Sequence, residues 1–261
     1  MRIISFCADG IRDAAQRGFF EWAADQDADI ICVQNLMARE EDLQDEVFYP
    51  EGYNAYFWDH YEQPINGVAL YCRKLPKAIM TGLGFMDYDM EGRYIQADYD
   101  HISIGCLLAP SAYAPPGTPI DADLQGRRDR FFELFQSHLS KIRNKRRQYI
   151  LCGNWTLTRG DIDLQDPEAN RDRPGALPRE QEWMAQLLGP SGGYLDAFRE
   201  VSADPDEYSW WPDGQRGRDG WRVDHQILSA DLGPLVEYGA YYKNDEFSSH
   251  APLIMDYDYE L

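Results

Sequence analysis

The chain has 261 residues, a length that fits one or two domains. Its formal net charge of −20 repels nucleic acid over most of the surface, so a polyanion could bind only where positive charge is locally concentrated. The five cysteines lie in apolar runs without a close pair or a neighbouring pair of histidines, which argues against a zinc or redox site. We expect small buried thiols, as in proteins of the reducing cytoplasm.

Short apolar runs alternate with amphipathic segments from end to end, which favours one domain over residues 1–261. We predict buried strands at residues 3–6, 30–33, 68–72 and 150–152. A helix is predicted between the first two strands from apolar residues at helical spacing, which are Ile11, Ala15, Phe19, Trp22 and Ala23. A longer helix is predicted before residue 148 from a second apolar stripe, made of Phe131, Phe135, Leu139 and Ile142.

Neither a secretory signal nor a membrane span is predicted. Residues 1–6 lead directly into a turn at Asp9 and Gly10, which is unlike the apolar core of a signal peptide. The longest uncharged stretch, residues 102–120, ends in a proline-rich loop and does not resemble a membrane helix. We therefore expect a cytoplasmic protein without membrane contacts.

A basic segment at residues 141–147 interrupts the acidic composition. Its five cations are Lys141, Arg143, Lys145, Arg146 and Arg147. One or two cations at a helix C-terminus would complement the helix dipole. Five in so short a segment indicate a contact surface for phosphate groups or for an acidic partner.

Four segments at predicted strand ends share a pattern with one group of metal-dependent phosphodiesterases. The strand near residue 150 ends in Gly-Asn154-Trp-Thr156 where that group has Gly-Asp-x-Asn, and residues 29–35 end in Gln-Asn35 where it has Gln-Glu. Residues 248–252 read Ser-Ser249-His250-Ala-Pro in place of Ser-Asp-His-Ala-Pro, and Arg-Val-Asp224 matches Arg-Ile-Asp. The chain thus resembles the exonuclease III-like branch of the endonuclease/exonuclease/phosphatase superfamily. This resemblance implies an α+β fold, the DNase I-like four-layer α/β/β/α sandwich.

The same resemblance implies that the metal and catalytic positions have degenerated. The changed positions are Cys7, Asn35, Leu108, Asn154, Thr156 and Ser249. Mg²⁺ is usually held by one or two carboxylates, whose charge the amides Asn35 and Asn154 do not supply. Asp224 and His250 remain, either as remnants of an acid–base pair or as a buried structural pair. We therefore expect no enzyme activity, no metal ligands and no cofactor, with Mg²⁺ needed only if a nuclease activity persists.

A narrower resemblance covers residues 140–153, together with residues 82–98 and 209–222. These segments resemble the catabolite repression control (Crc) proteins. That resemblance implies a translational repressor that assembles with the RNA chaperone Hfq on A-rich messenger RNA. A patch of five cations contacts few phosphates, so we expect weak binding to RNA alone and stronger joint assembly.

Three functions follow from these patterns. The leading prediction is a catalytically inactive, Crc-like RNA regulator that contacts its partners through the basic segment. The alternative is an exonuclease III-like DNA-repair nuclease, an AP endonuclease, with an altered metal site. The third is a module that binds only protein. In each case we expect the long polar connections at residues 111–125 and 158–177 to form surface loops at the rim of the site.

Overall fold

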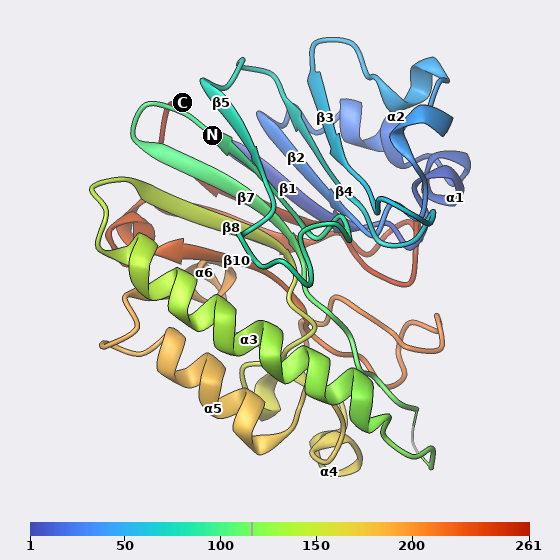
Figure 1. Cartoon of the computed structure of the whole chain (residues 1–261), viewed down its shortest axis with the longest axis vertical. Coiled ribbons are helices and arrows are strands. Elements are labelled where there is room, and N and C mark those ends of the chain that lie inside the picture. Colours follow the sequence, from blue (N-terminus) through green and yellow to red (C-terminus); the bar gives the residue numbers. More distant parts are fainter. Residues whose placement is uncertain (116) are drawn as a thin grey trace.

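Two mixed β-sheets pack face to face, and helices lie against their outer faces (Figure 1). The computed structural model describes residues 1–115 and 117–261. The first sheet has the order β11-β12-β1-β2-β4-β3, whose strands span Val236–Tyr241, Leu253–Tyr257, Arg2–Cys7, Ile30–Gln34, Val68–Cys72 and Asn54–Trp58. The second has the order β5-β6-β7-β8-β10-β9, whose strands span Ala78–Thr81, Tyr94–Asp98, Ile102–Leu108, Gln148–Asn154, Asp224–Ser229 and Tyr194–Asp196.

Helices flank the two sheets on opposite sides. Beside the first sheet lie α1 (Ile11–Gln16) and α2 (Phe19–Ala24), whereas α3 (Ala122–Arg143) and α5 (Pro178–Leu187) lie along the second (Figure 1). The connections contain α4 (Pro167–Asn170), α6 (Ala197–Val201) and 3₁₀ turns at Glu40–Asp42, Glu46–Phe48, Asp161–Asp163 and Ala230–Leu235. No helix in the described ranges is both long and apolar enough to cross a bilayer.

Three apolar layers separate these four structural layers. Alternate residues of a strand point to opposite faces of its sheet. In β2, Ile30 and Cys32 therefore join the core between the sheets, while Ile31 and Val33 join the core beneath α1 and α2. A third core joins the second sheet to α3 and α5. The predicted α+β fold, a four-layer α/β/β/α sandwich, is confirmed.

The predicted strands at residues 3–6, 30–33, 68–72 and 150–152 lie within β1, β2, β4 and β8. The predicted helix between β1 and β2 is wrong in one respect, because it is divided into α1 and α2. Gly18 separates them with φ of 87°, in the left-handed region that a continuous α-helix excludes. The long helix α3 is confirmed, and the side chain of Asp121 caps it by accepting hydrogen bonds from the next turn.

The two long connections are partly ordered. Residues 122–125 belong to the first turn of α3, so the first loop is shorter than predicted; Pro116, within it, lies outside the described residues. The second connection contains a 3₁₀ turn and α4.

Strand register brings the ends of both sheets to one edge. In the second sheet, Asn154 at the end of β8 pairs with Leu108 of β7 on one side and with Asp224 of β10 on the other. In the first sheet, Cys7 at the end of β1 pairs with Gln34 of β2, directly before Asn35. The residues singled out from the sequence therefore meet where the two sheets end.

Candidate active site

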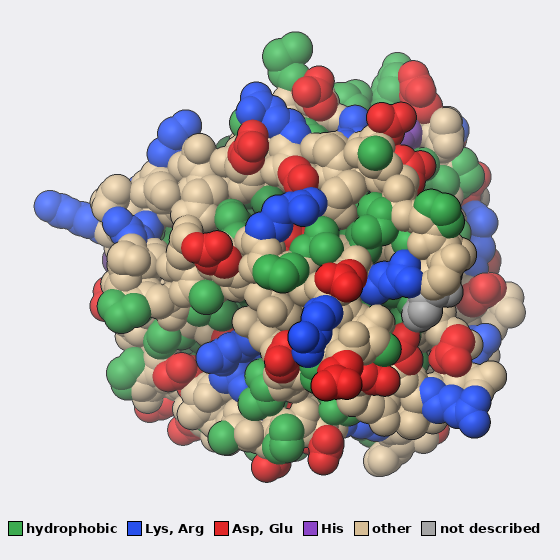
Figure 2. All heavy atoms as spheres, turned by 90° about the horizontal axis from the view of Figure 1, so that it is seen from below, with side chains coloured by type: hydrophobic (Ala, Val, Ile, Leu, Met, Phe, Trp, Pro, Cys, Tyr) green, Lys and Arg blue, Asp and Glu red, His purple; other side chains and the backbone are tan. Residues whose placement is uncertain are grey.

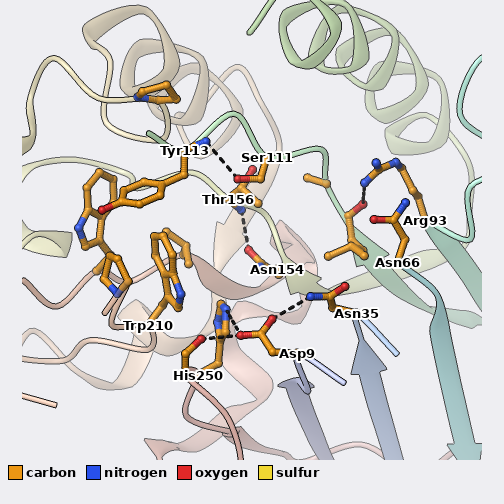
Figure 3. A pocket seen from close by; sticks show the side chains of 17 residues that line it. Asp9, Asn35, Asn66, Arg93, Ser111, Tyr113, Asn154, Thr156, Trp210 and His250 are labelled. Atoms are coloured by element: carbon orange, nitrogen blue, oxygen red, sulfur yellow. Dashed lines mark hydrogen bonds and ion pairs between the residues drawn. The ribbon is translucent and has the colours of Figure 1, made fainter. Parts of the chain in front are cut away.

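A cavity of about 450 Å³ opens at this common edge of the sheets (Figure 3). Five of the six positions that we predicted to be degenerate line it, namely Asn35, Leu108, Asn154, Thr156 and Ser249. The sixth, Cys7, is buried directly behind them, where its Sγ accepts a hydrogen bond from Nδ2 of Asn154 at 3.5 Å. The loop predictions are confirmed here by Ser111, Tyr113 and Pro174, which also line the cavity.

The two predicted remnants, Asp224 and His250, form a direct pair. His250 Nδ1 lies 2.7 Å from Asp224 Oδ2, and both side chains are buried. Ser209 Oγ donates a hydrogen bond to the same carboxylate oxygen at 2.7 Å, which fixes its direction. Because Asp224 holds Nδ1, the other ring nitrogen of His250, Nε2, faces the cavity.

Asp9 is a cavity residue that the sequence analysis did not single out as part of the site. It follows β1 and points into the cavity between Asn35 and His250 (Figure 3). Its Oδ1 accepts a hydrogen bond from Asn35 Nδ2 at 2.8 Å, and its Oδ2 accepts one from the Ser249 hydroxyl. Asp9 thus places a carboxylate beside Asn35 and Ser249, the two neighbouring positions where the family pattern has a carboxylate and this chain does not. Asp9 could have been identified from its position shortly after a predicted buried strand, because Asn35 and Asn154 follow predicted strands in the same way.

Strained backbone is concentrated around the cavity. Asp9, Asn35, Asn66 and Thr156 all line the cavity and have φ between 47° and 56°. Thr156 is β-branched, for which this conformation is a genuine outlier. The buried guanidinium of Arg128 holds it by donating to the Thr156 carbonyl at 2.6 Å and to the Pro110 carbonyl at 2.7 Å. Such strain is typical of functional sites, where the surrounding structure imposes it.

The charged side chains that line the cavity are those of His250, Asp9 and Arg93. Burial lowers the pKa of His250, but the neighbouring carboxylates of Asp224 and Asp9 raise it well above the usual value, which favours the protonated ring at neutral pH. Burial raises the pKa of Asp9, but His250 and hydrogen bonds from Ser249 and Asn35 lower it below the usual value, so Asp9 is ionised. Burial raises the pKa of Cys7 to about 11, so its thiol is neutral. Arg93, also missed from the sequence, adds a second cation to the lining.

Aromatic rings form one wall of the cavity. Trp210 stacks on the imidazole of His250 at 5.8 Å between ring centroids, and Tyr113 meets Trp210 edge to face at 4.9 Å. Trp221, which also lines the cavity, packs edge-on against Tyr113. The cavity therefore combines an apolar wall with two cations and one carboxylate.

The donor set does not fit the Mg²⁺ ion that the exonuclease III-like fold implies. Among the described residues that line the cavity, Asp9 is the one carboxylate. Both of its oxygens already accept hydrogen bonds, and Oδ2 lies 3.8 Å from Nε2 of the cationic His250. Mg²⁺ gives up its water reluctantly and prefers hard anionic oxygens. The Asp9 carboxylate, which already faces the His250 ring, and the amides of Asn35 and Asn154 are a poor replacement for such ligands.

The basic segment lies far along the second sheet, at the end of α3. Arg143 donates to the carbonyls of Ser191 and Gly192, and Arg147 donates to those of Tyr99 and Ile102, so both hold neighbouring loops. The other three cations, Lys141, Lys145 and Arg146, are exposed and form no ion pair with the described residues. None of the five lines the cavity.

Comparison with known proteins identifies the family of the chain. The model of the endonuclease/exonuclease/phosphatase family matches residues 9–250. The chain belongs to that family. It is 28% identical to an exodeoxyribonuclease of Bacillus subtilis over 97% of this chain and 98% of that protein. It is also 28% identical to the DNA repair nuclease APEX1 of Danio rerio, over 98% of this chain and 81% of that protein.

Solved structures agree on the fold. An AP endonuclease from Archaeoglobus fulgidus superposes with a TM-score of 0.87 at 20% identity, covering 99% of this chain and 100% of that one. A 3′-5′ exonuclease from Neisseria meningitidis gives a TM-score of 0.84 at 20% identity, with the same coverage. At this identity the two superpositions establish the architecture alone.

The prediction that the chain is not an enzyme is contradicted by these relatives. Proteins 26–28% identical over 97–98% of the chain are named as exodeoxyribonucleases or DNA-repair nucleases. The prediction compared family positions one at a time and found Asn35 and Ser249 without their carboxylates. It did not consider that Asp9, on an adjacent loop, places a carboxylate within hydrogen-bonding distance of both.

Proposed function

We propose that the chain is a DNA phosphodiesterase of the exonuclease III type with an altered metal site. The observation that carries this proposal is the buried Asp224–His250 pair, which presents a cationic ring to the same cavity as Arg93. The family relatives named as exodeoxyribonuclease and DNA repair nuclease support DNA as the substrate class. An abasic site is the first candidate within that class, since a further relative is named for it.

The two cations would bind the scissile phosphate. Arg93 is largely buried, and its Nε donates a hydrogen bond to the carboxylate of Glu91. This contact fixes the orientation of the Arg93 guanidinium. Arginine suits phosphate because its donors form a planar fork that matches two phosphate oxygens. The imidazolium of His250 supplies the second charge, and its Nε2 proton is available to an oxygen of the phosphate.

Asp9 would orient the attacking water. Its ionised carboxylate accepts hydrogen bonds, and it lines the cavity beside His250. Asp224 has a positioning role, because it holds His250 Nδ1 and so directs Nε2 toward the reacting phosphate. Positioned acids and bases of this kind typically contribute about 10²- to 10⁴-fold to a rate.

The overall negative charge does not exclude DNA. On the face shown in Figure 2, Lys and Arg side chains are interspersed with Asp and Glu, so this face is not uniformly negative despite the net charge of −20. Two cations in the cavity can contact only a few phosphates, so DNA binding there does not require a positively charged surface over the whole protein. Binding should accordingly weaken as salt concentration rises.

The test is strand scission of a duplex that contains one abasic site, with Mg²⁺, Mn²⁺, Co²⁺ or Zn²⁺ supplied separately. We expect a nick at the abasic site with at least one of these ions and its loss in His250→Gln. A second duplex with an undamaged recessed 3′ end distinguishes exonuclease from endonuclease activity. If neither duplex is cut under any of these conditions, the proposed function is refuted.

A second candidate function rests on the exposed end of α3. Lys141, Lys145 and Arg146 project there without ion-pair partners among the described residues, in a chain whose net charge is −20. We propose that this surface contacts RNA, with A-rich RNA and Hfq as the partners that the Crc-like segments imply. Arg143 and Arg147 would support the surface from its edges, because they hold adjacent loops.

This candidate is tested by a gel-shift titration of A-rich RNA, alone and with Hfq. We expect weak binding of RNA alone and a supershift with Hfq that disappears when Lys141, Lys145 and Arg146 are replaced by glutamate. The matched control reverses Arg130, an exposed cation earlier on α3 that pairs with Glu133. Equal supershifts for both variants would exclude the end of α3 as the contact.

A further inference from the structure

Three loops beside the cavity are joined to one another by backbone hydrogen bonds. We name them the acidic rim, which comprises residues 36–42, 59–66 and 86–92. Met37 N donates to the Asn66 carbonyl at 2.8 Å, and Tyr61 N donates to the Met90 carbonyl at 2.9 Å. Asn66 lines the cavity on the side opposite Trp210 (Figure 3). The acidic rim therefore borders the cavity across from its aromatic wall.

Five large apolar side chains of the acidic rim are exposed to solvent. They are Met37, Tyr61, Ile65, Met86 and Met90, whose exposed fractions lie between 41% and 93%. Single exposed apolar side chains are common on protein surfaces. Five on three joined loops form a group, and an apolar group surrounded by polar residues is typical of a binding surface. Methionine suits such a surface because its flexible side chain adapts to the partner.

The same three loops carry concentrated negative charge. They contain eight acidic residues and one basic residue, Arg39, so their formal net charge is −8 + 1 = −7. The acidic residues are Glu40, Glu41, Asp42, Asp59, Glu62, Asp87, Asp89 and Glu91. Glu41 pairs with Arg39, and Glu91 pairs with Arg93 and Arg127. The other six carboxylates form no ion pair with the residues that the structure describes.

Two of these six carboxylates belong to loops that are held close together. The backbone N of Glu40 donates to Asp59 Oδ2 at 2.7 Å. Burial, and then the negative charge of Asp59, raise the pKa of the Glu40 carboxyl above its usual value. A cation placed between the two loops would relieve this repulsion. The acidic rim therefore favours a positively charged partner.

We propose that the acidic rim binds a partner protein through an amphipathic segment rich in lysine and arginine. Apolar side chains of that segment would cover Met37, Tyr61 and Met90, and its cations would pair with the six carboxylates. This inference goes beyond the proposed function, because His250, Asp224 and Asp9 take no part in it.

Other occupants fit this surface less well. The phosphates of a nucleic acid or of an anionic lipid would face the net charge of −7. A second copy of the chain has a net charge of −20, and its own basic segment at residues 141–147 has no exposed large apolar side chain. A basic and partly apolar segment of another protein matches both the charge and the apolar group.

The probe is a fluorescently labelled helical peptide, about 18 residues long, with leucine at every third or fourth position and lysine at most others. We expect saturable binding to the full chain, measured by fluorescence anisotropy, that weakens as salt concentration rises. Replacing the leucines of the peptide by serine, or its lysines by glutamate, should weaken binding at least about tenfold. The first change tests the apolar contribution and the second tests the charge.

NMR of isotope-labelled methionine methyl groups locates the peptide without any variant. We expect the resonances of Met37, Met86 and Met90 to shift when the peptide is added. The resonances of Met1, at the opposite end of β1 from the cavity, and of the buried Met184 should stay unchanged. A cationic peptide that binds the acidic protein non-specifically would spread over its surface. Equal shifts at Met1 would therefore overturn the inference.

A matched pair of variants tests the surface itself. Tyr61→Ser/Glu62→Lys removes an exposed aromatic side chain and reverses one charge on the acidic rim, and should weaken peptide binding at least about tenfold. The control, Glu237→Lys/Tyr238→Ser, makes the same two changes on exposed residues of β11, at the other edge of the first sheet from β3 and β4. It should bind within about twofold of the wild type. Equal weakening in the two variants would refute the acidic rim as the docking surface.

The same measurements distinguish the other occupants. A single-stranded oligodeoxynucleotide that shifts the methyl resonances of Met37, Met86 and Met90, when the peptide does not, would overturn the inference in favour of nucleic acid. Sedimentation velocity at rising protein concentration tests a second copy. We expect no self-association, and self-association that Tyr61→Ser/Glu62→Lys abolishes would also overturn the inference. None of these results bears on the strand-scission test, so the proposed function stands or fails separately.

Discussion

His250 Nδ1 and Asp224 Oδ2 lie 2.7 Å apart and join the two sheets at their common edge. Asp224 begins β10 in the second sheet, whereas His250 lies three residues before the start of β12 in the first. The pair therefore has a structural role as well as the proposed chemical one. Removing either partner should affect both stability and function, so each must be measured.

Asp224→Asn should lower the pKa of His250, because Asp224 is the largest of the charges that raise it. In the wild type the folded pKa lies above the roughly 6.5 of an unfolded histidine. The pair's stabilisation is then complete below about pH 6.5 and is lost as pH rises toward the folded pKa. Titration of the imidazole resonances by NMR checks the shift. An unchanged His250 pKa in the variant would contradict the assignment.

Asp9→Asn should lower the rate of DNA cleavage by about 10²- to 10⁴-fold while leaving the fold intact. Asparagine tolerates the left-handed backbone at this position, where φ is 47°, and its carbonyl can still accept from Asn35. Steady-state cleavage rates and thermal melting would be compared. A variant with the full rate would show that the carboxylate has no part in the chemistry.

Gly153→Ala should destabilise the protein by at least about 1–3 kcal/mol. A Cβ at Gly153 would lie 2.0 Å from the Leu107 carbonyl oxygen, and φ is 150°. The matched control is Gly126→Ala in α3, where a Cβ meets nothing within 4 Å and alanine should stabilise by up to about 1 kcal/mol. Urea denaturation gives both values, and equal effects would contradict the close packing of β7 against β8.

Arg128→Met should cost about 3–5 kcal/mol, because it leaves the buried carboxylate of Glu180 without its partner. The double variant Arg128→Met/Glu180→Gln should be more stable than the single one, since no unpaired charge remains. The free energies of unfolding of all three proteins test this order. A double variant less stable than Arg128→Met would show that Glu180 stabilises the fold mainly through its other contacts, such as that with Gly175 N.

Four buried strands could be predicted from the sequence pattern, and the four-layer fold from the resemblance to the family. Strands buried on both faces are continuous apolar runs, as in β2 and β4, and this pattern survives without knowledge of neighbouring strands. The division between α1 and α2 was missed because the apolar spacing continues across Gly18, whose left-handed conformation only the structure reveals.

The site was harder to predict because its residues meet only through the fold. Asp9 and Ser249 are 240 positions apart in the chain, yet their side chains are hydrogen bonded. Motif comparison identified the changed positions but not the carboxylate that lies between them.

The most direct test is the single-turnover cleavage of an abasic-site duplex by the wild type and by His250→Gln, purified in parallel. With protein in excess over DNA, the measured rate reports the chemical step and excludes product release. We predict cleavage by the wild type and a rate lower by about 10²-fold or more in the variant. Equal rates for the two proteins, or no cleavage by the wild type with any of the four metal ions, would contradict a phosphodiesterase built on Asp224 and His250.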